Sequence, residues 1–333
     1  SAIVMAADLA QTPVSGIEVV LCGDAHLSNF GVFATPERKL VFDLNDFDEA
    51  YPGPWEWDLK RLAASAAVAG RQHGFKDKNN RKLAQLVARV YRKAMRQFSK
   101  QAILDVWYYH VEADQVLKLF EDYSKKGAKS TQRMLKKART KTQEVTLEKL
   151  TEFVGGRRRF INEPPLLVRL NDLLDEGQRA HITPEYVEKS WFEYLSSLPE
   201  ERRLLLSRFR PADVALRVGG VGSVGTRCTI LLLEGGAAED AIILQQKEAG
   251  PSVLEAYLPE HGYINHAHRV VTAQRLMQAA SDIFLGWHQS SLTERQYYWR
   301  QLKDMKGSVD VASLDETGMG TYLAVCSHSL AHA

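Results

Sequence analysis

The spacing of apolar and polar positions divides the chain into a mostly helical part and a strand-rich part. Residues 55–73 and 79–106 place apolar side chains at helical intervals, and residues 166–210 continue this texture. After Pro211, short apolar runs separated by glycines predict strands at 214–218, 228–233, 241–245, 282–287 and 296–302. Helices are expected again at 265–280 and 321–333. The pattern therefore predicts an α+β protein with a small antiparallel sheet after a helical region.

Two short strands in the helical part, residues 19–22 and 39–42, flank a turn that contains Asp24, His26 and Asn29. The second strand is followed by four acids, Asp43, Asp46, Asp48 and Glu49. Strand ends that bring carboxylates and an amide oxygen together suit Mg²⁺, which prefers oxygen ligands. An Asp-rich turn, whose side chains only cap the backbone, is the simpler alternative.

Asp24 and Asn29 have the spacing of the Asp and Asn in the kinase catalytic loop, where a second Asp follows the next strand. GDAHLSN resembles the HGDxHxxN loop of the aminoglycoside phosphotransferase and choline kinase group, and DFDEAYPGPWEWDL resembles that group's following segment. The resemblance implies that Asp24 is the catalytic base and that Asn29 holds Mg²⁺ together with Asp43 or Asp46. His26 would contact the γ-phosphate or fix the conformation of the loop, and we favour the second role. Asp58 would brace the loop, and Cys22 replaces the usual His.

A glycine-rich segment, GGVGSVGTR, lies between two of the predicted strands. Its backbone N–H groups could approach phosphate oxygens closely, and we expect residues 220–226 to cover a nucleotide, namely Gly220, Gly222, Ser223, Val224, Gly225 and Thr226. Lys247 ends the next strand, where kinases place the lysine that binds the α- and β-phosphates. Glu255 is the candidate partner of this lysine, with Glu260 in reserve, and residues 302–308 would form the hinge.

These parts occur in the reverse of the kinase order, which a circular permutation would explain if they meet in space. We therefore expect a bilobal, protein-kinase-like fold with permuted element order. Residues 1–212 would form a helical catalytic domain, 213–308 a nucleotide-binding sheet domain, and 309–333 a helix that returns to the first. The same order of motifs resembles a large bacterial family of unknown function over nearly the whole chain.

Composition narrows the class of protein. The chain has 333 residues, 45% of them hydrophobic, and a net charge of +2, which gives no reason to expect nucleic-acid or membrane binding. Its three cysteines predict reduced thiols in a cytoplasmic protein, and the basic stretch 123–142 predicts a solvated helix or loop. The chain begins without Met and ends within a predicted helix, so we expect a fragment of a longer protein.

The predicted activity is ATP- and Mg²⁺-dependent phosphoryl transfer to a hydroxyl group, with a small molecule as the acceptor. Two other functions remain open on the sequence. The protein could bind nucleotide as a regulatory pseudokinase, or the acids could serve a metal-dependent phosphoesterase.

Overall fold

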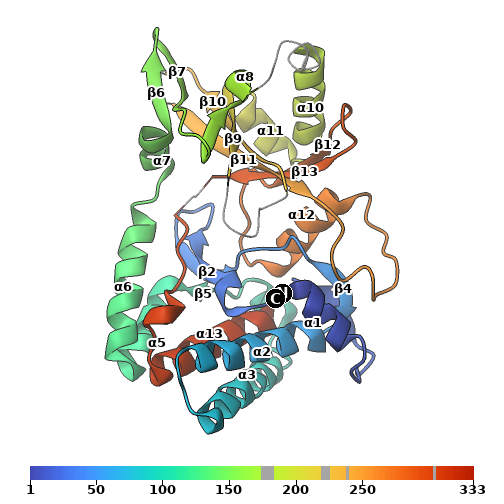
Figure 1. Cartoon of the computed structure of the whole chain (residues 1–333), viewed down its shortest axis with the longest axis vertical. Helices are drawn as coiled ribbons and strands as arrows, with labels where there is room; N and C mark the ends of the chain where they lie inside the picture. Colours follow the sequence, from blue (N-terminus) through green and yellow to red (C-terminus); the bar gives the residue numbers. More distant parts are fainter. Residues whose placement is uncertain (174–183, 219–225, 238–239, 303–304) are drawn as a thin grey trace.

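The computed structural model describes residues 1–173, 184–218, 226–237, 240–302 and 305–333. It is a mixed α/β protein in which the described strands pair antiparallel. Figure 1 shows a six-stranded sheet in the upper part and most of the long helices in the lower part. No helix in these ranges is long and apolar enough to cross a membrane.

The lower part is built from helices around two small sheets. The helices are α1 (Ala2–Leu9), α2 (Glu56–Gln72), α3 (Asp77–Phe98), α4 (Ile103–Trp107), α5 (Ala113–Tyr123), α6 (Lys125–Arg139) and α13 (Glu316–His332). One sheet pairs β1 (Glu18–Leu21) with β4 (Tyr51–Pro54), and the other has the order β2 (Phe30–Ala34), β3 (Leu40–Leu44), β5 (Val111–Glu112). α13 packs against α2, α3, α5 and β3, so the C-terminal helix lies in the lower part.

A buried core beneath β2 and β3 fixes the loop that carries Asp24 and Asn29. Phe30 and Phe42 stack in parallel at 6.3 Å between ring centroids, and Tyr322 of α13 meets Phe42 edge-on at 6.0 Å. Tyr322 also donates a hydrogen bond of 2.8 Å to the carbonyl of Leu27. Because all three rings are fully buried, the helix and the loop cannot move independently without losing packing.

The upper sheet has the order β12-β13-β11-β10-β9-β8. Its strands are β8 (Leu167–Arg169), β9 (Arg210–Arg217), β10 (Cys228–Glu234), β11 (Ala241–Ala249), β12 (Gly286–Gln289) and β13 (Gln296–Gln301). Helix α12 (His266–Met277) connects β11 to β12 and packs against β11, β12 and β13. The sequence predicted all of these strands except β8, and it placed β12 a few residues too early.

Residues between the lower helices and β9 pack on the sheet as well. They form α7 (Gln143–Leu150), the hairpin β6 (Thr151–Val154) and β7 (Arg157–Phe160), α8 (Leu170–Leu173), α10 (Pro184–Ser196) and α11 (Glu200–Leu206). Leu147 and Phe160 share one apolar cluster with Ile230 and Ile243, and Tyr194 shares another with Trp299. The predicted domain boundary after residue 212 falls inside β9. Residues from both sides of this boundary share the two apolar clusters.

Several local predictions are confirmed. Helix α2 covers the predicted stretch, and the basic segment 123–142 is largely the helix α6. The three cysteines, Cys22, Cys228 and Cys326, are buried free thiols. The predicted helix 79–106 is instead two helices, α3 and α4, separated by residues 99–102.

Candidate functional site

Asn29 holds together the two polar loops that the sequence singled out. Its Nδ2 donates hydrogen bonds to the carbonyls of Asp24 (3.1 Å) and Asp46 (2.9 Å), and its Oδ1 accepts one from the backbone N–H of Asp46 (2.8 Å). The side chain is buried, so these bonds face little competition from water. Asn29 thus places the Asp24 loop beside the loop between β3 and β4, residues 45–50, which we call the acidic loop. Its role as a metal ligand stays a prediction, since its amide oxygen already has backbone donors.

Asp58 braces the start of the Asp24 loop, as predicted. The buried carboxylate accepts hydrogen bonds from the backbone N–H groups of Cys22 (2.7 Å) and Gly23 (3.1 Å), and burial raises its pKa to about 6. Gly23 has φ +82°, and a Cβ there would lie 2.0 Å from the carbonyl oxygen of Glu49. The turn into the loop therefore requires glycine.

The carboxylate of Asp24 faces an open groove. Arg61 Nε lies 2.6 Å from Oδ1, His26 Nε2 lies 3.6 Å from Oδ2, and the Asp24 side chain is 27% exposed. The groove has a volume of about 1300 Å³ and runs between α1, α2 and residues 308–312. A carboxylate at such a position can accept a proton from a molecule bound in the groove.

His26 shapes the loop through its imidazole ring. Its Nδ1 accepts a hydrogen bond from the backbone N–H of Ser28 (3.1 Å). Burial lowers the pKa of His26, although the charge of Asp24 acts in the opposite direction. A neutral ring that accepts at Nδ1 carries its proton on Nε2, the atom that faces Asp24. These contacts agree with the predicted role in fixing the loop.

The structure distinguishes the two acids that the sequence left as alternatives. Asp43 is buried at the end of β3, where its oxygens accept hydrogen bonds from the backbone N–H groups of Leu44 (2.8 Å) and Ala279 (3.2 Å). Burial raises the pKa of Asp43 to about 7. Asp46 is exposed, and its carboxylate forms no hydrogen bond or ion pair with any residue of the described ranges. Asp46 is therefore the acid available to a cation.

Lys247 of β11 reaches the acidic loop. Its Nζ lies 2.8 Å from Asp48 Oδ2, and the hydroxyl of Tyr298 donates to Asp48 Oδ1 at 2.6 Å. Burial would raise the pKa of Asp48, but the charge and hydrogen bond of Lys247 hold it below its ordinary value. Lys247 and Asp48 are 199 residues apart in sequence. This pair joins the strand-rich part to the loop after β3.

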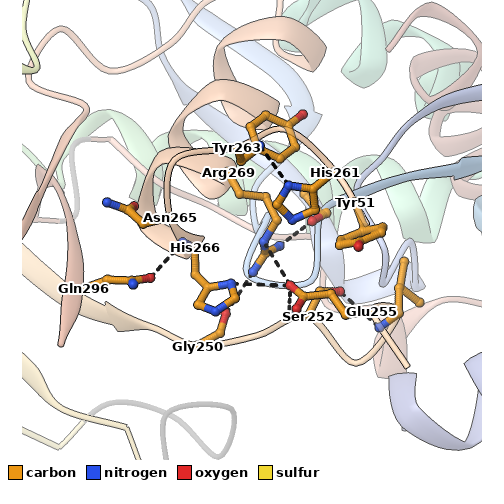
Figure 2. A network of polar contacts seen from close by, with 12 residues as sticks. Tyr51, Gly250, Ser252, Glu255, His261, Tyr263, Asn265, His266, Arg269 and Gln296 are labelled. Atoms are coloured by element: carbon orange, nitrogen blue, oxygen red, sulfur yellow. Dashed lines mark hydrogen bonds and ion pairs between the residues drawn. The ribbon is translucent and has the colours of Figure 1, made fainter. Parts of the chain in front are cut away.

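The expected pair between Lys247 and Glu255 is not formed. Glu255 Oε1 lies 3.4 Å from His266 Nδ1 and 3.8 Å from Arg269 Nε (Figure 2). Both partners belong to α12 and its start, whereas Lys247 pairs with Asp48. The sequence placed Glu255 near the site but could not assign its partner, because no local spacing links it to α12.

Arg269 is the principal residue that sequence reasoning missed. Its side chain is fully buried, and it donates hydrogen bonds to the carbonyls of Ala50, Asp48 (3.0 Å) and Gly250 (2.9 Å). Figure 2 shows its guanidinium at the centre of this network. Arg269 therefore fixes the backbone of the acidic loop against α12 and the segment after β11. Its only sequence signal was a charged residue among the apolar positions of a helix.

The remaining predicted residues belong to the glycine-rich segment. Gly220, Gly222, Ser223, Val224 and Gly225 lie outside the described residues. Thr226 follows them, and the flanking strands β9 and β10 pair antiparallel, as predicted for a hairpin. Within the described ranges, no group of three or more His, Cys, Asp or Glu side chains is arranged to hold a metal ion.

Comparison with known proteins gives one match. No curated protein and no solved structure matches the chain significantly. The model of a family described as an uncharacterised protein conserved in bacteria (DUF2252) matches residues 1–333. Over its whole length, from α1 to α13, the chain belongs to this bacterial family.

Proposed function

We propose that the protein transfers a phosphoryl group from ATP, with Mg²⁺, to a hydroxyl group of a small molecule, on a kinase-like fold of permuted order. One observation carries the proposal: Lys247, from the strand after the glycine-rich segment, contacts the acidic loop that Asn29 ties to Asp24. Phosphoryl transfer needs a phosphate-binding lysine, a metal-binding carboxylate and a base in one place. These contacts link the segments that carry Lys247, Asp46 and Asp24, although the segments are far apart in sequence, and this supports the proposal.

Each residue has a distinct role in this proposal. Lys247 would bind the α- and β-phosphates, and residues 220–226 would cover them. Asp46 would hold Mg²⁺, because its carboxylate is exposed and oxygen ligands suit this ion. The ion would neutralise charge on the phosphates when bound. Asp24 would accept the proton of the acceptor hydroxyl, while Asn29 and Arg269 keep the loops in position.

The groove beside Asp24 is the proposed acceptor site. Its lining mixes polar and charged side chains, including Asp8, Ser28 and Asp310, with apolar ones such as Val4 and Val68. A hydroxylated molecule bound there would present an oxygen to the Asp24 carboxylate.

Thermal unfolding with and without Mg²⁺-ATP tests the nucleotide site. Ligand at about a hundredfold excess over Kd stabilises the native state by about 2.7 kcal/mol. We expect an upward shift in the wild type and its loss in Lys247→Met, which keeps the length of the side chain but removes the charge. Lys39→Met, an exposed lysine on the turn before β3, is the matched control and should keep the shift.

The outcome also separates the other two functions. ATP binding without turnover on any acceptor would indicate a regulatory nucleotide-binding protein. Hydrolysis of a generic phosphoester with Mn²⁺, at equal rates in the wild type and Lys247→Met, would indicate a phosphoesterase. Absence of a shift in both proteins would contradict the nucleotide site itself.

A further inference from the structure

A small cavity with cationic walls is separate from the Asp24 groove, with which it shares no lining residue. It is enclosed by the β2–β3 turn, the end of α12, residues 281–283, the end of β13 and Lys306. Its volume of about 100 Å³ is ample for a tetrahedral oxyanion, since one water needs about 10–15 Å³ on the same measure. Arg38, Arg300 and Lys306 line it, and among its described lining residues Asp282 is the one acid.

Asp282 forms no ion pair with Arg300 or Lys306, because its oxygens already have other donors. The oxygens of Asp282 accept hydrogen bonds from the backbone N–H of Gln301 (2.6 Å), that of Phe284 (2.8 Å) and the Gln301 side chain (3.2 Å). Arg300 bonds only neutral oxygens, those of Gln245 (3.3 Å) and Asn45 (3.5 Å), and forms no ion pair with the described carboxylates. Among the described side chains that line it, the cavity therefore has more basic groups than acidic ones.

Lys306 is the least satisfied of these groups. Its ammonium makes no hydrogen bond or ion pair with any residue in the described part of the chain. Its backbone is fixed, because its carbonyl accepts from Lys141 Nζ (3.0 Å) and the next residue, Gly307, pairs with Val32. A partly buried, held and unpaired ammonium is costly, and a bound anion would remove that cost.

We propose that this cavity binds a phosphate or sulfate group, held by Lys306 and Arg300. The group could be a free inorganic anion or a phosphate of a bound nucleotide. The proposal does not depend on nucleotide binding at Lys247, and each can fail without the other.

The charges around Lys306 support this assignment. Burial lowers the pKa of Lys306 to about 7, and Arg300 acts in the same direction, while Asp282 and Asp46 oppose it and Lys247 adds to it. A bound anion favours the protonated amine. Sulfate stays doubly charged between pH 6 and 9, so its affinity in the wild type should fall over this range as Lys306 loses its proton.

Sulfate binding by the whole chain is the test, measured by calorimetry and by thermal unfolding against sodium chloride of equal ionic strength. Sulfate also stabilises proteins by exclusion from their surface, so Lys78→Met, an exposed lysine on α3, is the matched control. In Lys306→Met we expect affinity to fall about ten- to hundredfold, the loss of a charge-assisted hydrogen bond. The ligand-free variant should also melt at a higher temperature than the wild type, which a purely structural lysine would not produce.

Two further measurements complete the design. Arg300→Gln should weaken sulfate binding without raising the melting temperature of the free protein, since Arg300 has neutral partners. Competition between sulfate and Mg²⁺-ATP would identify the group as a nucleotide phosphate, and independent binding would identify a separate anion site. The proposal is overturned if the wild type and Lys306→Met respond equally to sulfate and phosphate, or if neither anion binds the wild type.

Discussion

Replacing Asp24 by Asn is expected to lower the rate of phosphoryl transfer by about 10²–10⁴-fold, the usual contribution of a general base. The amide cannot accept the proton of the acceptor hydroxyl, but it can still accept the hydrogen bond from Arg61, which now lies 2.6 Å from Oδ1. The KM for ATP should change little, because the substitution leaves unchanged the residues proposed to bind the phosphates and Mg²⁺, Lys247 and Asp46. The rate is measured as transfer of labelled phosphate from ATP, first to water and then to a panel of polyhydroxylated acceptors.

Asp8→Asn is the matched control for this experiment. Asp8 is exposed on α1 and lines the same groove, so the substitution removes an equal charge from the acceptor site. It should leave the rate within a small factor of the wild type. Equal rates in Asp24→Asn and wild type, with both proteins folded, would exclude Asp24 as the base and leave the loop a purely structural role.

Arg269→Met is expected to destabilise the protein by about 3–5 kcal/mol, as measured when one partner of a buried charge pair is removed. The substitution removes the guanidinium beside the Glu255 carboxylate, which keeps His266 as a neighbour, and leaves the carbonyls of Ala50, Asp48 and Gly250 without their donor. The free energy of unfolding is obtained from urea denaturation. Arg81→Met, on the exposed face of α3, should change it by less than about 0.5 kcal/mol.

A double variant separates the effect of losing the ion pair with Glu255 from the effect of losing the hydrogen bonds to the loop carbonyls. Adding Glu255→Gln to Arg269→Met removes the charge of this carboxylate, so part of the lost stability should return, while the three carbonyls stay without donors. Because these carbonyls include that of Asp48, Mg²⁺-ATP should stabilise the double variant less than the wild type. A loss below about 1 kcal/mol in Arg269→Met would show that water replaces the guanidinium, contrary to its full burial.

Local signals in the sequence predicted most elements of the fold and several members of the candidate site. Helix α2 and strands β1, β3, β9, β10, β11 and β13 follow from apolar spacing, which depends on neighbours a few residues away. Asp58 was correctly read as a brace of the loop. Strand β8 was missed, because its three residues lie in helical texture and become a strand through pairing with β9.

The surroundings of Asp43 and Asp46 were decided only by the tertiary structure. The sequence placed both acids after the same predicted strand and left them as alternatives. Asp43 is still within β3, and its side chain meets the backbone at the end of α12. Asp46 lies beyond the strand and is exposed. Asp43 has a backbone donor because the end of α12 lies beside it. No local sequence pattern specifies where α12 packs relative to β3.

The same reason explains the partners of Lys247 and Glu255. The sequence determined the family, the order of the elements and the strand that carries Lys247. The packing of the upper sheet over the acidic loop decided that Lys247 pairs with Asp48, and that Glu255 serves the buried Arg269 instead. Spacing along the chain specifies which side chains share a face. Ion pairs between distant segments depend on how the whole core packs, because an unpaired buried charge costs several kcal/mol.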